Sequence, residues 1–240
     1  MDLGFAAGET VVVTGAGSGI GHAIATLAAS AGLRVAAWDV DAAAVAETAA
    51  GIVAAGGSAV ALTADVSDPE AVRKALEAGG PARYLVNNAG PASSGDMVFA
   101  RALELTVGSV RLVTQAWLDT GPAEGAAVVN IASVAGNHLG TASDWYCAGK
   151  AAIAGYTRHL ALAYAPAVRA NAIAPGLIAT PRMAGFVETD LGRAIVGRNP
   201  QGRPGAPGDV AGAALFLLSP LAAYVNGVLL PVDGGWLIAQ

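Results

Sequence analysis

Short runs of β-branched residues alternate along the chain with longer stretches rich in alanine and leucine. Strands are predicted at residues 10–15, 34–39, 59–66, 83–90, 126–133, 168–176 and 227–235, and helices at 21–32, 41–56, 68–79, 99–119, 144–164 and 207–219. This alternation favours parallel strands joined by right-handed crossovers. We therefore expect an α/β fold, with a doubly wound parallel sheet of about seven strands and helices on both faces.

The composition agrees with a fold of this kind. Hydrophobic residues make up 54% of the 240 positions and charged residues 13%. This balance suits a sheet covered on both faces, and it leaves apolar surface for contacts between subunits. No repeat or linker divides the chain, so one domain spanning residues 1–240 is expected. The net charge of −5 argues against a nucleic acid or an anionic membrane as partner, because both attract basic patches.

Cysteine usage and the distribution of apolar residues favour a cytoplasmic location. Cys147 is the only cysteine, which excludes a disulfide within the chain and fits a reducing compartment. The first ten residues have no basic region typical of a signal peptide. The most apolar stretch, 211–232, is interrupted by polar residues and proline well short of the roughly 20 apolar residues of a membrane span. No spacing of His, Cys and acidic residues indicates a metal site.

The segment TGAGSGIG, residues 14–21, lies between the first predicted strand and the first predicted helix. In a doubly wound sheet a dinucleotide pyrophosphate meets a helix N-terminus here, where glycines allow close approach and free N–H groups bind phosphate. The glycines are Gly15, Gly19 and Gly21, with Gly17 in addition, so their spacing differs from G-x-G-x-x-G. A tight turn would use glycines in the same way, and both interpretations stay open here.

Asp39 ends the second predicted strand, eighteen residues after Gly21. An acid at this place accepts hydrogen bonds from the adenosine ribose hydroxyls of NAD, and its charge repels the 2′-phosphate of NADP. The glycine-rich segment offers no Arg or Lys to hold that phosphate. We therefore expect NAD (NADH) rather than NADP. The alternative is that Asp39 caps the next helix, a role that Asp41 fits equally well.

Tyr146 and Lys150 lie four residues apart in the predicted helix 144–164, and Lys150 is one of two lysines in the chain. A tyrosine is a suitable acid or base for alcohol oxidation when its pKa falls from about 10 toward neutrality. A lysine at i+4 shares the helical face, and its charge favours the phenolate. Ser133, at the end of a predicted strand, is placed to donate a hydrogen bond to a substrate oxygen. The alternative is an amphipathic helix whose lysine extends to solvent.

Together these segments resemble the classical short-chain dehydrogenase/reductase (SDR) family over nearly the whole chain. The matching pieces are TGAGSGIG (14–21), DV (65–66), NNAG (87–90), Ser133, YCAGK (146–150), PGLIAT (175–180) and PVDGGW (231–236). The resemblance implies a Rossmann-like fold and an NAD-dependent alcohol dehydrogenase or carbonyl reductase. Such an enzyme interconverts a secondary alcohol and a ketone by hydride transfer. The resemblance also implies a homotetramer or a dimer.

The resemblance further assigns roles to individual residues. Tyr146 is implied as the acid/base, Ser133 as the residue that orients the substrate, and Lys150 as the group that tunes Tyr146 and binds the nicotinamide ribose. The residues implied in cofactor binding are Gly15, Gly17, Ser18, Gly19, Ile20, Gly21, Asp39, Asp65, Val66, Asn88, Ala89, Gly90, Tyr146, Lys150, Pro175, Gly176, Ile178 and Thr180, with Asn87 structural. A helix cap at Asp65 and a tight turn at 175–176 are alternatives compatible with these roles.

One position departs from the family pattern. Alignment on Gln115–Ala116 places Thr106 where the family has a catalytic asparagine, which helps to hold a water in a proton relay. A threonine hydroxyl can hold a water but lacks the two donors of an amide. A slower relay, a relay rebuilt from neighbours and weak catalysis all stay open, and we expect a working enzyme. Fifteen residues separate Gly90 from Thr106, several fewer than in the family, so the substrate cleft should be more open on this side.

The substrate side of the site is less defined. His138, five residues after Ser133, lies in a loop that the family uses as a substrate wall, and it is a candidate for substrate contact. Segment 181–205 matches the family's substrate-binding segment, and its glycines and prolines suit a lid. A medium-sized secondary alcohol or ketone is the expected substrate class. A cofactor-binding sensor or scaffold with weakened catalysis, and a nucleotide-fold methyltransferase, are the alternative functions.

Overall fold

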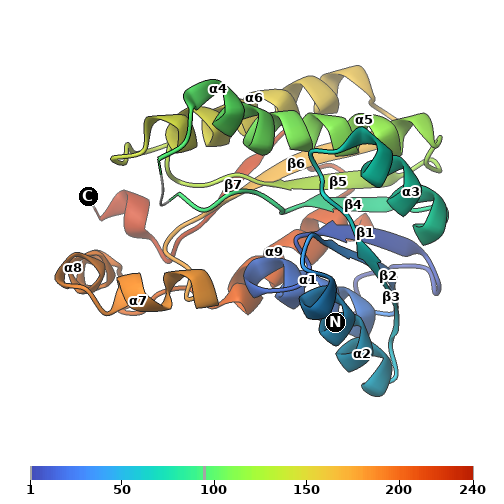
Figure 1. The fold of residues 1–240 in the computed structure, drawn as a ribbon, viewed down its shortest axis with the longest axis horizontal. Helices are drawn as coiled ribbons and strands as arrows, with labels where there is room; N and C mark the ends of the chain where they lie inside the picture. The colour runs from blue at the N-terminus through green and yellow to red at the C-terminus, as the bar shows by residue number, and fades with distance from the viewer. Residues whose placement is uncertain (1, 94–95, 240) are drawn as a thin grey trace.

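The computed structural model describes residues 2–93 and 96–239. Within these residues, seven strands form one parallel sheet in the order β3-β2-β1-β4-β5-β6-β7 (Figure 1). The strands are β1 (Thr10–Thr14), β2 (Arg34–Asp39), β3 (Ser58–Thr63), β4 (Tyr84–Asn87), β5 (Ala126–Ile131), β6 (Val168–Pro175) and β7 (Leu229–Val232). This architecture confirms the prediction of a doubly wound α/β sheet.

Helices cover both faces of the sheet (Figure 1). One face carries α1 (Gly19–Ser30), α2 (Ala42–Ala54) and α9 (Pro207–Leu218), and the other carries α3 (Pro69–Gly79), α5 (Ser109–Asp119) and α6 (Asp144–Ala163). Strand β1 shows why its sequence is a continuous apolar run. Val11 and Val13 pack into the core on the α1 face, while Val12 packs into the core on the α6 face. Burial on both faces favours valine at every such position.

The path of the chain locates the functional edge of the sheet. Strand β1 pairs with β2 on one side and with β4 on the other, so the chain reverses its direction of winding after β3. In open α/β sheets, a ligand crevice forms where the order reverses, outside the carboxyl ends of the strands. The other elements include the shorter helices α4 (Phe99–Leu103), α7 (Ala184–Val187) and α8 (Asp190–Arg198), and 3₁₀ turns at Pro181–Met183, Pro220–Ala222 and Trp236–Ile238.

Local signals account for several element boundaries. Asp68 accepts a hydrogen bond from the Glu70 N–H at 2.9 Å and Pro69 starts α3, as the sequence predicts. The strands predicted at 59–66 and 83–90 end earlier, at Thr63 and Asn87. The residues that follow each strand are thereby free to line the crevice.

The helix predicted over 99–119 begins and ends where expected, at Phe99 and Asp119, but it is not α-helical throughout. A π-helical turn, Glu104–Gly108, separates α4 from α5. Two hydroxyls bond to backbone carbonyls in this turn: Thr106 donates to Ala102 O at 2.7 Å, and Ser109 donates to Leu105 O at 2.9 Å. Side-chain bonds of this kind supplement the backbone ladder where an extra residue widens the helix, and π turns are frequent at functional sites. In the described part of the chain, no helix is long and apolar enough to cross a membrane.

Candidate active site

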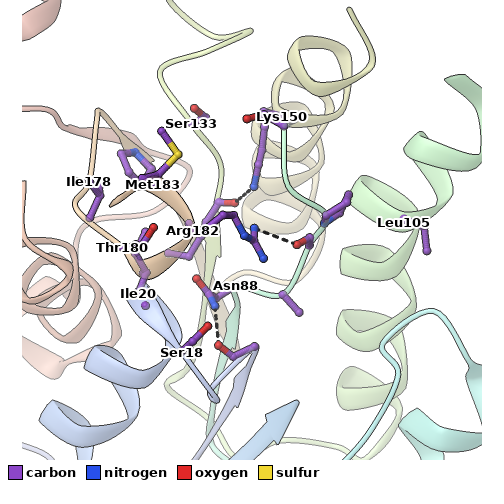
Figure 2. Close-up of a pocket in the computed structure, with 18 of the residues that line it drawn as sticks. Ser18, Ile20, Asn88, Leu105, Ser133, Lys150, Ile178, Thr180, Arg182 and Met183 are labelled. Atoms are coloured by element: carbon purple, nitrogen blue, oxygen red, sulfur yellow. Dashed lines mark hydrogen bonds between the residues drawn. The ribbon is translucent and has the colours of Figure 1, made fainter. Parts of the chain in front are cut away.

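A cavity of about 540 Å³ opens at the carboxyl edge of the sheet, where β1, β4, β5 and β6 end. Residues from segments far apart in the sequence line it (Figure 2). Those that the sequence predicts as site residues are Gly15, Ser18, Gly19, Ile20, Asp39, Asp65, Val66, Asn88, Ala89, Gly90, Ser133, Tyr146, Lys150, Pro175, Gly176, Ile178 and Thr180. The fold therefore brings the nucleotide-type motifs and the Ser–Tyr–Lys set into one cavity.

The glycine-rich turn joins β1 to the N-terminus of α1. Gly15 has φ +66° and Gly19 has φ +55°, a region that favours glycine. A Cβ at Gly21 would lie 1.9 Å from Gly15 O, and a Cβ at Gly17 would lie 2.9 Å from Asp39 Oδ2. Gly17 and Gly21 do not line the cavity themselves. Their lack of side chains lets the turn close tightly enough to present the helix N-terminus to the cavity.

Asp39 and Asp41 have separate roles in the structure. Asp39 Oδ2 accepts from the Gly17 N–H at 2.8 Å, and Oδ1 accepts from the Asp41 N–H at 3.1 Å. Asp41 is the cap of α2, because its carboxylate accepts from the N–H groups of Ala43 and Ala44. The alternative in which Asp39 caps this helix is therefore excluded, and its carboxylate faces the cavity beside the glycine turn.

Asp65 and Val66 line the same end of the cavity as Asp39. Hydrogen bonds from the Ser67 N–H and Ser67 hydroxyl to Asp65 Oδ1 hold the pKa of Asp65 below its ordinary value. The N-cap of α3 is Asp68, not Asp65. Asp65 therefore stabilises the turn at residues 65–67, and Asp68 caps α3.

Asn88 ties the end of β4 to the glycine-rich turn. Its Nδ2 donates to Thr14 O at 3.0 Å and to Gly15 O at 3.1 Å. The preceding Asn87 is buried and donates to the side chains of Thr114 and Asn130, which is a structural role. Asn88 thus aligns the two backbone segments that border the cavity.

The Ser–Tyr–Lys set stands opposite the glycine turn. Helix α6 carries Tyr146 and Lys150 one turn apart, with Lys150 Nζ 5.7 Å from the centre of the Tyr146 ring, and Ser133 follows β5. Lys150 Nζ donates to Ile131 O at 2.8 Å (Figure 2). Asn137 Nδ2 donates to both Ser133 O and Lys150 O, which joins the loop after β5 to α6. The alternative of a lysine that extends to solvent is excluded by the Ile131 contact.

Burial dominates the protonation of the two titratable groups. It raises the pKa of Tyr146, although a hydrogen bond with Ser133 and the charge of Arg182 act in the opposite direction. Burial, followed by the charge of Arg182, lowers the pKa of Lys150 to about 8. Burial thus shifts the pKa of Tyr146 in the direction opposite to the one that an acid/base role requires, because desolvation disfavours the phenolate.

The residues after β6 form the remaining wall. Pro175, Gly176, Ile178 and Thr180 all line the cavity. A Cβ at Gly176 would lie 2.9 Å from Cα of Asp233, so a close backbone approach requires glycine there. The Thr180 methyl would be 3.2 Å from a Cβ at Gly19, which brings this wall up to the glycine turn.

Besides Gly17 and Gly21, the candidates Thr106 and His138 do not line the cavity. Thr106 is buried in the π turn and its hydroxyl is engaged by Ala102 O, whereas the neighbouring Leu105 does line the cavity. His138 is exposed in the loop after β5. Their roles in a proton relay and in substrate contact stay predictions.

Sequence reasoning did not identify Leu105 as a cavity residue, and it placed Arg182 only within the expected substrate-binding segment 181–205. Arg182 lies in the 3₁₀ turn directly after Thr180, and its guanidinium reaches into the space between Lys150 and Asn88 (Figure 2). Its place two residues after the PGLIAT segment was the available signal. In the described residues, no group of three or more His, Cys, Asp or Glu side chains is arranged to hold a metal ion.

Comparison with known proteins agrees with this geometry. Residues 15–237 match a family model described as Enoyl-(Acyl carrier protein) reductase. The chain is 38% identical to galactitol 2-dehydrogenase (L-tagatose-forming) of Cereibacter sphaeroides, and the match covers 96% of each chain.

Solved structures with the same fold hold dinucleotides. A proposed NAD(P) dependent gluconate 5-dehydrogenase from Beutenbergia cavernae, with NADP at low occupancy, has a TM-score of 0.88 and 38% identity, covering 99% of this chain and 100% of that one. A 7α-hydroxysteroid dehydrogenase complexed with NADH and 7-oxo glycochenodeoxycholic acid has a TM-score of 0.90 and 32% identity, covering 98% and 96%. Such neighbours bind NAD(H) or NADP.

Proposed function

Because the chain belongs to the short-chain dehydrogenase/reductase family, we propose that it is an NAD(H)-dependent oxidoreductase that interconverts a secondary alcohol and a ketone. The observation that carries this proposal is the convergence of Ser133, Tyr146 and Lys150 with the glycine turn in one cavity. A methyltransferase has no need for this set of side chains.

The cavity fits a dinucleotide at the carboxyl edge of the sheet. The turn from Gly15 to Gly21 presents the N-terminus of α1, where N–H groups and the helix dipole favour a pyrophosphate. Asp39 would accept from the adenosine ribose, Asp65 and Val66 would flank the adenine, and Thr180 would meet the carboxamide. When bound, NAD supplies the hydride acceptor for alcohol oxidation, and NADH the donor for the reverse reaction.

NAD is the proposed form of the cofactor. Asp39 places a carboxylate beside Gly17, and its charge opposes a 2′-phosphate. A Cβ at Gly17 would lie 2.9 Å from both Asp39 Oδ2 and the Ala44 side chain, so this position has no room for a basic side chain.

Each side chain of the Ser–Tyr–Lys set has a separate role in the proposed proton transfer. Ser133 donates to the substrate oxygen and orients it, and Tyr146 takes the hydroxyl proton in oxidation or returns it in reduction. Lys150 lies one turn from the phenol, and its charge opposes the rise in pKa that burial causes. With a pKa of about 8, Lys150 is largely protonated at neutral pH and can hold this role.

The proposal also covers the substrate lid, the oligomeric state and the cellular location. Segment 181–205, which contains α7 and α8, serves as a lid over a medium-sized secondary alcohol or ketone. Exposed apolar side chains, among them Leu162 on α6 and Tyr224, are suited to contacts in a homo-oligomer, a tetramer or a dimer. We also infer a cytoplasmic location, because Cys147 is the only cysteine and can form no disulfide within the chain.

The test is turnover of NAD with a panel of secondary alcohols by the wild-type chain and by Tyr146→Phe. We expect Tyr146→Phe to lose about 10²- to 10⁴-fold in kcat, the usual contribution of a positioned acid/base. Tyr156→Phe is the matched control, because it makes the same change on α6 at a residue that does not line the cavity. NAD binding without turnover by the wild-type chain would favour the sensor or scaffold function instead.

A further inference from the structure

Arg182 carries a charge that the described protein does not neutralise. No ion pair within residues 2–93 and 96–239 includes this side chain. Its hydrogen bond to Gly90 O is 3.5 Å long, beyond the ordinary range for an N–H donor. The guanidinium nevertheless reaches across the cavity from the 3₁₀ turn at Pro181–Met183 (Figure 2). It is therefore held near the site by its place in the chain and has donors free for a ligand.

The reacting end of the cavity is electropositive. Arg182 and Lys150 are close enough that the charge of Arg182 lowers the pKa of Lys150. The two carboxylates that line the cavity, Asp39 and Asp65, lie at its other end and accept hydrogen bonds from their own surroundings. An oxidised nicotinamide would add a third positive charge beside Tyr146. A bound anion between these groups would relieve the repulsion, whereas a neutral substrate would not.

We propose that Arg182 binds the carboxylate of the substrate, so that the preferred substrates are hydroxy acids and the corresponding keto acids. This inference rests on the proposed dehydrogenase function and narrows its substrate class. A guanidinium presents a planar pair of donors that matches a carboxylate. In the proposed function the dinucleotide pyrophosphate would have a different partner, the N-terminus of α1, where Ser18 and Ile20 line the cavity. The relatives include enzymes named for a neutral polyol and for gluconate, so the charge of this cavity is what selects between the two classes.

The experiment compares acids with neutral analogues of the same shape. The probes are cis-4-hydroxycyclohexanecarboxylate against its carboxamide, and D-gluconate against D-glucitol, each with saturating NAD. The variants are Arg182→Met, Arg182→Lys and, as matched control, Arg193→Met. Arg193 lies in α8 and is paired with Asp190 at 2.6 Å, and it does not line the cavity.

We expect the wild-type chain to prefer the acid of a pair. Arg182→Met should lower kcat/KM for the acid by about 10- to 100-fold, mainly through KM, and leave the neutral partner nearly unchanged. The kcat/KM of Arg182→Lys for the acid should lie between those of the wild-type chain and Arg182→Met. Arg193→Met should behave as the wild-type chain. Fluorescence titration with NADH should show the same Kd for all four proteins.

Several results would overturn the inference. A wild-type enzyme that turns over neutral alcohols as well as or better than acids has no carboxylate preference. Arg182→Met could instead lower kcat/KM equally for acid and neutral probes and raise the Kd for NADH. That result would show that Arg182 binds the cofactor and not the substrate. Failure of the wild-type chain to oxidise any secondary alcohol would instead contradict the proposed function itself, and the inference with it.

Discussion

At Gly149, helix α6 packs directly against Thr106 of the π-helical turn. A Cβ at this position would lie 2.5 Å from Thr106 Oγ1 and 3.0 Å from Thr106 Cβ. Thr106 is buried, and its hydroxyl donates to Ala102 O at 2.7 Å. The side chain is β-branched and cannot rotate freely. We predict that Gly149→Ala destabilises the protein, because either α6 must move or Thr106 must give up its hydrogen bond.

The expected change in the free energy of unfolding of Gly149→Ala is the balance of three contributions. Loss of the Thr106 hydrogen bond costs about 1 kcal/mol, and overpacking of a filled core costs about 1–3 kcal/mol. Alanine in place of glycine in a helix returns about 0.5–1 kcal/mol. The net loss in the free energy of unfolding should therefore be about 1–3 kcal/mol. Turnover should fall as well, since Lys150 is the next residue and must shift with the helix.

Urea unfolding followed by circular dichroism measures this effect. Gly155→Ala is the matched control, because it lies in the same helix and a Cβ there meets nothing within 4 Å. It should be neutral or slightly stabilising. Combination of Gly149→Ala with Thr106→Ala removes the nearest atom, so a double-mutant cycle should give a coupling energy of about 1–2 kcal/mol. A Gly149→Ala variant as stable as the wild-type chain, or strictly additive effects, would refute the steric argument.

Three further predictions concern the site. Burial lowers the pKa of Lys150 from 10.5 to about 8, so between these values the unfolded chain binds more protons. The free energy of unfolding of the wild-type chain, relative to that of Lys150→Met, should therefore be higher at pH 10 than at pH 7.5, by about 1–3 kcal/mol in urea titrations. A difference between the two proteins that does not change with pH would contradict the lowered pKa of Lys150. Asp39→Ala should lower the ratio of kcat/KM for NAD over that for NADP by about tenfold or more, and an unchanged ratio would remove the role assigned to Asp39. Thr106→Asn should keep or raise kcat, and a folded but inactive variant would mean that the relay around Lys150 is built differently.

The fold was predictable because its signals are local. Alternating apolar runs and alanine-rich stretches define strands and helices through the periodicity of each segment. The cap at Asp68 and the helix start at Pro69 depend on a few neighbouring residues, and the structure has both. Within the helix predicted for 99–119, the π turn was not predictable, because such a turn leaves the apolar periodicity almost intact.

Site residues were predictable where residues close together in the sequence determine how their side chains or backbone are placed. Tyr146 and Lys150 share a helical face at i+4, and Gly15 and Gly19 adopt positive φ within one turn. The choice between Asp39 and Asp41 as helix cap was not predictable, since both residues fit the sequence preference. The contact of Asp39 with the Gly17 N–H, twenty-two residues earlier, is what separates them.

The sequence by itself determined the α/β architecture, the glycine-rich turn and the Ser–Tyr–Lys set, because periodicity, backbone φ and i+4 spacing are properties of short segments. Only the tertiary structure decided that Thr106 faces Gly149 instead of the cavity, that His138 is exposed, and that the Arg182 guanidinium lies near Lys150. Each of these depends on which distant segments meet, and thus on the packing of α6, the π turn and the segment after β6. The charge that we expect to select the substrate arises from that packing.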